Sequence, residues 1–192
     1  MTADGWWAET RGPDLAQGDL VAGLAVPRVA TPVDAAVDHV DVETVTLDVI
    51  VLTQTCDLEH GKQPDVLVGR VVSWESFVAA QLQGGNEAVR SSQFAKNLRN
   101  GAVPPLHLLR YHEGAPQLSW SLVVFRELQT VPRDMLTRHV EQQPQRLRLR
   151  SPYREHLGQA FARFFMRVGL PLDVDDFERD GPAIAKAATA GA

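Results

Sequence analysis

The sequence predicts an α+β domain, built from a small SH3-like β-barrel or a strongly bent antiparallel sheet, with a helical insert and a C-terminal packing helix. Two pairs of apolar, β-branched segments, each joined by a short polar connection, predict two β-hairpins. A helical pattern between the two pairs predicts the insert. A helical pattern with clear start and stop signals after the last strand predicts the packing helix.

Length and composition favour a single domain. The chain has 192 residues, 44% of them hydrophobic, which is enough for one sizeable core. We expect this domain at 1–172 and a loosely held tail at 173–192. Within the domain, the predicted parts are a barrel-like start at 18–73, the insert at 74–101, a hairpin and a strand at 106–150, and the helix at 151–169.

The first hairpin follows an initial strand. In "GDLVAGLAVPRV", a Gly-Asp turn signal precedes an apolar strand that we expect to end at Pro27. The nearly continuous β-branched run at 45–55 is typical of a strand buried on both faces. "DVLVGRVVSW" is its predicted partner, so we expect Cys56 at the loop end of this hairpin.

The insert is predicted from helix caps. Ser73 suits the N-cap of a short helix that the pair Gly84-Gly85 stops. Asn86 suits the cap of a second, more polar helix that ends at Gly101. Beyond it, "LHLLRYH" and "QLSWSLVVFREL" are separated by a turn sequence and predict the second hairpin.

The last strand and the helix after it place charged side chains on defined faces. In "RLRLR", alternation turns two leucines to the core and three arginines to the opposite face. For the helix, Ser151 is the predicted N-cap, Pro152 the first helical residue and Gly169 the C-cap. Its polar face carries residues at spacings of three and four, namely His156, Gln159, Arg163 and Arg167.

The arginines are concentrated in one part of an acidic chain. The net charge is −5, yet 133–167 holds eight arginines and three acids, a net of +5 against −10 elsewhere. Arginine suits phosphate because its planar fork donates two hydrogen bonds at once. One interpretation is therefore a phosphate-binding face made of Arg146, Arg148, Arg150, His156, Arg163 and Arg167. The other is that these arginines pair with the acidic part of the chain and serve the fold, and both stay open.

Cys56 also has two interpretations. With Asp57 beside it and His60 four residues on, it offers a thiol, a carboxylate and an imidazole within a short stretch, as a cysteine-dependent hydrolase needs. Alternatively it is a small apolar residue packed at the end of a strand, with Asp57 holding the turn. The polar residues 53–55 inside an otherwise apolar segment favour the first interpretation somewhat, because buried polar groups need partners.

Other kinds of site are excluded or have little support. A metal site built from Cys56, His60 and a third histidine does not match zinc-ligand spacing, and we expect no metal and no cofactor. The sequence has no P-loop, nucleophile elbow or HExxH motif. One cysteine excludes an internal disulfide, and no apolar run is long enough to cross a bilayer, so we expect a cytoplasmic protein with no membrane partner.

The order "GDLVAGLAVP", "LDVIVLTQTCD", "DVLVGRVVS" resembles the opening of the MazF/PemK-like small β-barrels. The resemblance covers about 18–73. It implies an SH3-like barrel and the RNA endonuclease activity of toxin–antitoxin systems, with a Ser or Thr after the second buried strand. Ser73 matches that hydroxyl, but Leu47-Asp48 stand where the family has its arginine.

These observations give one favoured function and two alternatives. We expect a bacterial toxin-like or defence-associated protein that binds or acts on a nucleic acid or nucleotide through the arginine-rich face, with the catalytic candidates Cys56, Asp57, His60 and Ser73. The first alternative is the cysteine-dependent hydrolase, acting on a small molecule or peptide. The second is a non-catalytic adaptor that docks a protein partner through Trp6 and Trp7. The oligomeric state is left open.

Overall fold

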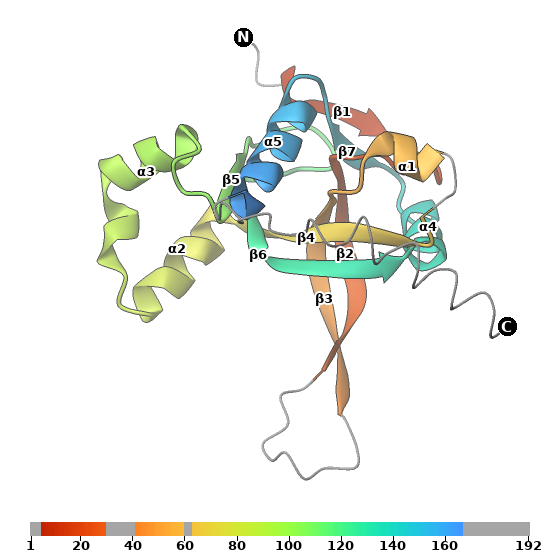
Figure 1. The fold of residues 1–192 in the computed structure, drawn as a ribbon, viewed down its shortest axis with the longest axis horizontal. Helices are drawn as coiled ribbons and strands as arrows, with labels where there is room; N and C mark the ends of the chain where they lie inside the picture. Colours follow the sequence, from red (N-terminus) through yellow and green to blue (C-terminus); the bar gives the residue numbers. More distant parts are fainter. Residues whose placement is uncertain (1–4, 30–40, 60–62, 167–192) are drawn as a thin grey trace, which may run out of the picture.

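The protein, described by a computed structural model over residues 5–29, 41–59 and 63–166, is an α+β fold built on one antiparallel sheet (Figure 1). Its strands are β1 (Trp7–Thr10), β2 (Asp19–Val29), β3 (Val42–Val51), β4 (Asp65–Ser73), β5 (Leu106–Leu109), β6 (Ser121–Pro132) and β7 (Arg146–Leu149). Its helices are α1 (Thr55–Glu59), α2 (Trp74–Gln83), the short 3-10 helix η2 (Glu87–Arg90), α3 (Ser92–Arg99), α4 (Arg133–Glu141) and α5 (Tyr153–Phe165).

The sheet is strongly bent but open. Its strand order is β1-β7-β2-β3-β4-β6-β5, with every neighbouring pair antiparallel, so β1 and β5 are its two edges. Register shifts in β2 and between β4 and β6 mark bulges, which bend strands and increase their twist. The α+β class and the bent antiparallel sheet are therefore confirmed, while the strands described here do not close into a barrel.

Both predicted hairpins form. β3 pairs with β4, and β5 pairs with β6, each in the antiparallel sense. The predicted end of the first strand at Pro27 is wrong, since β2 continues to Val29 and Pro27 lies opposite Thr44. This outer half of β2 has β3 as its one ladder neighbour, and a proline is tolerated where its nitrogen faces an open edge.

The strand predicted at 45–55 ends earlier, at Val51. Beyond Val51, side-chain hydroxyls accept hydrogen bonds from the neighbouring backbone. The Thr53 hydroxyl accepts the Leu67 N–H at 2.8 Å, and the Thr55 hydroxyl accepts the Gln17 N–H at 3.2 Å. The chain then turns into α1, so Cys56 lies in a short helix within the β3–β4 connection rather than at a strand end.

The helical insert is confirmed, but its second helix begins at a later N-cap than predicted. Ser73 caps α2 by accepting the Ser76 N–H at 3.1 Å, as predicted. The second helix is shorter than expected, because Ser91, and not Asn86, provides its side-chain cap. No helix in the described ranges combines the length and the hydropathy needed to cross a bilayer.

Besides α1, two elements were not predicted. β1 is an edge strand of four residues, and α4 follows Pro132 directly. In α5 the N-cap position is Pro152 rather than Ser151, without a side-chain capping bond. The predicted C-cap Gly169 and the tail at 173–192 lie outside the described residues.

Helices cover the sheet on both faces. Val49 and Val51 point into a cluster that also contains Leu136 and Val140 of α4. Ile50 points to the opposite cluster, with Leu157 of α5. The inner part of β3 is thus buried on both faces, as its β-branched run predicts. A third cluster packs α2 and α3 against β5 and β6, so the apolar side chains of the insert are used internally.

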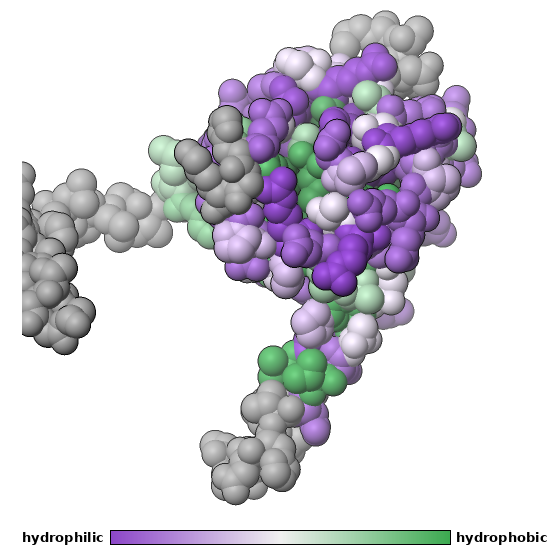
Figure 2. Space-filling view, turned by 90° about the vertical axis from the view of Figure 1, so that its right-hand side faces the viewer, coloured by the Kyte–Doolittle hydropathy of each residue, from purple (hydrophilic) through white to green (hydrophobic). Residues whose placement is uncertain are grey.

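The outer halves of β2 and β3 project from the body as a two-stranded arm (Figure 1). Figure 2 shows a hydrophobic patch near the end of the described part of this arm. There Val29 and Val42 lie opposite each other, 59% and 62% exposed.

A buried carboxylate joins the two parts of the sheet. Asp19, fully buried in β2, binds Arg146 through Nε at 2.9 Å and also accepts hydrogen bonds from Arg148. The same carboxylate accepts the Ala16 N–H at 3.2 Å. The two guanidinium groups reach further, to the carbonyls of Gly12 and Asp14. One side chain therefore fixes β2, β7 and the preceding loop.

Replacing this carboxylate by its neutral isostere tests that role. We expect Asp19→Asn to lower the free energy of unfolding by about 3–5 kcal/mol, because Arg146 then keeps a buried charge without a counter-ion. Urea denaturation followed by tryptophan fluorescence measures the change. Asp65→Asn, which alters an exposed aspartate of β4, is the matched control and should change stability by less than about 0.5 kcal/mol. Equal midpoints for the two variants would show that the ion cluster does not hold the sheet.

Candidate functional site

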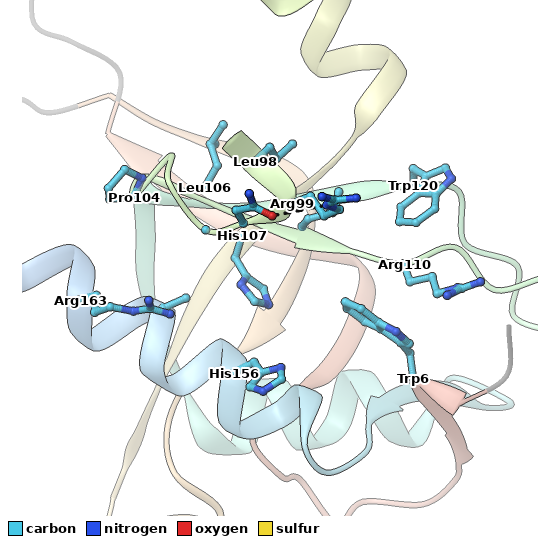
Figure 3. A pocket seen from close by; sticks show the side chains of 14 residues that line it. Trp6, Leu98, Arg99, Pro104, Leu106, His107, Arg110, Trp120, His156 and Arg163 are labelled. Atoms are coloured by element: carbon cyan, nitrogen blue, oxygen red, sulfur yellow. Dashed lines mark hydrogen bonds between the residues drawn. The ribbon is translucent and has the colours of Figure 1, made fainter. Parts of the chain in front are cut away.

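A pocket of about 660 Å³ lies between the two edges of the sheet (Figure 3). It is bounded by the segment before β1, by β5 and the residues after it, by the end of α3, and by one face of α5. The side chain of Trp7 in β1 donates to the Arg110 carbonyl after β5 at 2.8 Å. The bend of the sheet thus brings its edges within reach of a side-chain bridge, and the pocket occupies the space beside that bridge.

Two tryptophans form one end of the pocket. Trp6 stacks on Tyr153 of α5, with ring centroids 4.1 Å apart and an interplanar angle of 15°. One of its faces is therefore covered, which leaves the other toward the pocket. Trp120 comes from the turn before β6 and is 42% exposed. Its ring packs edge-on against that of Tyr111, with ring centroids 5.3 Å apart. A flat aromatic ligand could stack against these indoles.

The polar lining of the pocket is rich in arginine and histidine. It contains Asn100, three arginines and two histidines, the last five being Arg99, Arg110, Arg163, His107 and His156. None of the described residues that line it is an aspartate or glutamate. Among the ion pairs within the described ranges, none involves these three arginines. In a protein of net charge −5, this is a local concentration of uncompensated positive charge.

Local structure explains why these side chains converge. Arg99 is in the last turn of α3, which ends where Gly101 adopts a positive φ of 67° and its N–H returns to the Leu98 carbonyl. His156 and Arg163 are seven residues apart on α5, two helical turns, and so share a face. The opposite face of α5 buries Leu157 in the core, which fixes the orientation of the helix.

Two groups in the pocket wall have no internal partner. His107 Nε2 and Arg110 Nε are buried without a hydrogen bond within the described part of the protein. Burial, together with the neighbouring charges of His156 and Arg163, lowers the pKa of His107 to about 4. At neutral pH His107 is uncharged. Unpaired buried polar groups are costly, and they are found where a site awaits a ligand.

The predicted arginine face does not form as one surface. Arg146 and Arg148 are held by Asp19, and this hydrogen bond raises the pKa of Arg148. Arg150 is exposed and donates its backbone N–H to the Trp6 carbonyl at 2.9 Å. For Arg146 and Arg148, pairing with the acidic part of the chain is what the structure shows.

The remaining members of that face behave differently. His156 and Arg163 line the pocket, and Arg167 lies outside the described residues. The pocket takes its other cations from Arg99 and Arg110, which were not predicted as site residues. Their sequence signals are weak: Arg110 follows an apolar stretch, Arg99 follows a mostly polar one, and neither belongs to a motif.

The predicted catalytic residues lie apart. Cys56 is exposed, and its Sγ lies 3.7 Å from Gln54 Oε1 and 3.8 Å from Asp57 Oδ1. The packed-cysteine interpretation is therefore wrong. Ser73 is the cap of α2 at the far end of β4, about 20 Å along the strand from the Leu67 that pairs with Thr53.

Within the described part of the chain, the other catalytic candidates add no base to this cysteine. His60 lies outside the described residues. Ser73 and Arg146 both line a smaller cavity of about 420 Å³, with Asp48, but the guanidinium of Arg146 is already bound by Asp19 and two carbonyls. Trp7, an anchor in the adaptor hypothesis, is buried in the core of its own domain.

The neutral state of His107 predicts a pH dependence of stability. Its folded-state pKa of about 4 lies below the ordinary value of 6.5, so an unfolded chain binds a proton that the folded chain excludes. Stability should therefore fall as pH decreases from about 7 to about 4, by on the order of 2–3 kcal/mol from this group. Urea denaturation across this range should show a shallower fall for His107→Gln than for the wild type. His156→Gln should lessen the fall without removing it, because burial is the larger cause, and identical profiles for all three proteins would contradict this account.

The exposure of Cys56 predicts its labelling. A thiol-specific disulfide reagent should modify the native protein at a rate within a few-fold of that in denaturant, because the sulfur is already accessible. Cys56→Ser provides the blank. Labelling that requires denaturant would restore the packed interpretation, and labelling far faster than in denaturant would indicate an activated nucleophile and favour the hydrolase alternative.

Comparisons with protein-family models, with curated proteins and with solved structures yield no match for this chain. Function must therefore be argued from the chemistry of the site, since a fold alone does not determine it.

Proposed function

We propose that this protein binds a nucleotide unit, free or within a single-stranded nucleic acid, in the pocket between β5, α3 and α5. The observation that carries the proposal is the composition of the pocket. Two tryptophans stand at one end of a space whose other polar side chains are three arginines, two histidines and Asn100, with no acid among the described lining residues. Its volume of about 660 Å³ lies in the range of small-ligand sites.

Each part of a nucleotide has a matching group. A base can stack on the open face of Trp6 or on Trp120, and stacking of this kind contributes about 1–3 kcal/mol per base. Phosphate oxygens accept bidentate hydrogen bonds from arginine, which the pocket supplies from α3, from the residue after β5 and from α5. A ligand oxygen near Arg110 would also offer its unpaired Nε a partner.

The proposal keeps the predicted ligand class and changes the residues. The arginine-rich face predicted on β7 and α5 is replaced by one in which only His156 and Arg163 are retained. The toxin-like or defence-associated role and the resemblance to MazF/PemK-like barrels stay predictions. Binding and cleavage of a strand are separate properties, and the pocket supports binding.

Anisotropy of a fluorescent single-stranded oligonucleotide, measured at two salt concentrations, tests the proposal. We expect binding whose affinity falls with salt, because arginines that bind phosphates release counterions. Trp120→Ala should weaken binding about 5- to 100-fold through lost stacking. Arg163→Gln should weaken it and reduce the salt slope by about one unit per lost phosphate contact.

Arg138→Gln is the matched control. It removes the same charge from an exposed position on α4, outside the pocket, so it should leave the salt slope unchanged. If the two arginine variants weaken binding equally, the protein attracts polyanions by its general charge and not through this pocket. If neither oligonucleotides nor nucleotides bind at low salt, the proposal fails.

A further inference from the structure

The pocket has two chemically different ends. Figure 3 shows Trp6, Trp120 and Arg110 at one end and Arg163 at the other, with His107 and His156 toward the Arg163 end. The groups at this second end come from two elements that are far apart in the sequence, β5 and α5. A bound nucleotide therefore has a preferred direction, with its base at the tryptophans and its phosphate at the histidines.

The second end has a positive character. Burial, together with the charges of His156 and Arg163, holds the pKa of His107 at about 4. Arg99, from the last turn of α3, lines the same pocket, while the ring of Phe125 packs beside His107 from β6 and carries no charge. Burial opposes a charge of either sign, but the contribution from His156 and Arg163 marks a positive potential, which favours negative charge placed beside these two residues.

The two forms of nucleic-acid phosphate differ in charge. An internal phosphodiester carries one negative charge, whereas a terminal phosphomonoester carries about −1.5 to −2 at pH 7 and presents three strong acceptor oxygens. Coulomb attraction to the same cations scales with that charge. The additional oxygen of a monoester also gives Arg163 and His156 more acceptor positions than the two free oxygens of a diester.

We propose that this end of the pocket takes a terminal phosphate, so that the ligand is a nucleoside monophosphate or the phosphorylated end of a strand rather than an internal phosphodiester. This inference rests on the proposed nucleotide binding and adds its direction and its specificity. Trp6 and Trp120 hold the base, and Arg163 with His156 holds the phosphate.

Paired ligands that differ only in the terminal phosphate test it. One short oligonucleotide is prepared with a 5′-phosphate, with a 3′-phosphate and with hydroxyls at both ends, carrying its dye at an internal position. AMP, adenosine and inorganic phosphate are the small competitors. We expect at least one phosphorylated oligonucleotide to bind about 10- to 100-fold tighter than the hydroxyl form, and AMP to compete far better than either adenosine or phosphate alone.

The variants then separate the two ends. Arg163→Gln, at an exposed position where the fold does not depend on it, should abolish the preference for the phosphorylated form. Trp120→Ala should weaken both forms and keep the preference. Arg138→Gln should match the wild type in both respects.

Each contrary result has a distinct meaning. Equal affinity for the phosphorylated and hydroxyl oligonucleotides would overturn this inference while leaving nucleotide binding intact. Inorganic phosphate competing as well as AMP would overturn it by showing an anion site without the base. No binding of any ligand would overturn both this inference and the proposed function.

Discussion

The carboxylate of Asp19 is the interaction on which the rest of the structure depends. The ladder between β2 and β7 is short, with Asp19 opposite Arg148 and Leu20 opposite Leu147. β1 is attached to the sheet through β7, and it is preceded directly by Trp6. The ion cluster that fixes β7 therefore also determines where Trp6 lies, and with it one end of the pocket. Burying Asp19 and Arg146, with Arg148 partly buried beside them, is costly, and their mutual hydrogen bonds together with the carbonyls of the preceding loop offset that cost.

The arginines of the C-terminal part have two separate uses. On β7, Arg146 and Arg148 neutralise a buried acid and belong to the fold. On α5, Arg163 lies on the solvent side of a helix whose other face is in the core, and it is directed at the pocket. One class of residue thus supplies both an internal counter-charge and an external anion site. The two uses differ in the neighbouring residues. Arg146 and Arg148 lie against Asp19, whereas none of the described residues that line the pocket with Arg163 is acidic.

The open sheet creates the site. A sheet bent this far brings its edges together, but β1 and β5 are joined by the Trp7 side chain and not by a ladder. The space left at that junction is covered by α5 and lined by residues from both edges. Edge strands and the ends of helices carry unpaired backbone groups, so a pocket formed there has hydrogen-bonding capacity. The side chain of His107, from the edge strand β5, adds the unpaired Nε2.

The features that depend on residues close together in the chain were determined by the sequence alone. These are the two hairpins, the Ser73 cap, the inward leucines of β7 and the helical face shared by His156 and Arg163. Each depends on neighbours a few residues apart, so periodicity and capping rules reach them. The tertiary structure alone decided that Arg146 meets Asp19, 127 residues away. It also decided that Trp6, Arg99 and Arg110 line one pocket with α5. A pattern states which face a side chain occupies, but only the packed fold states what that face meets.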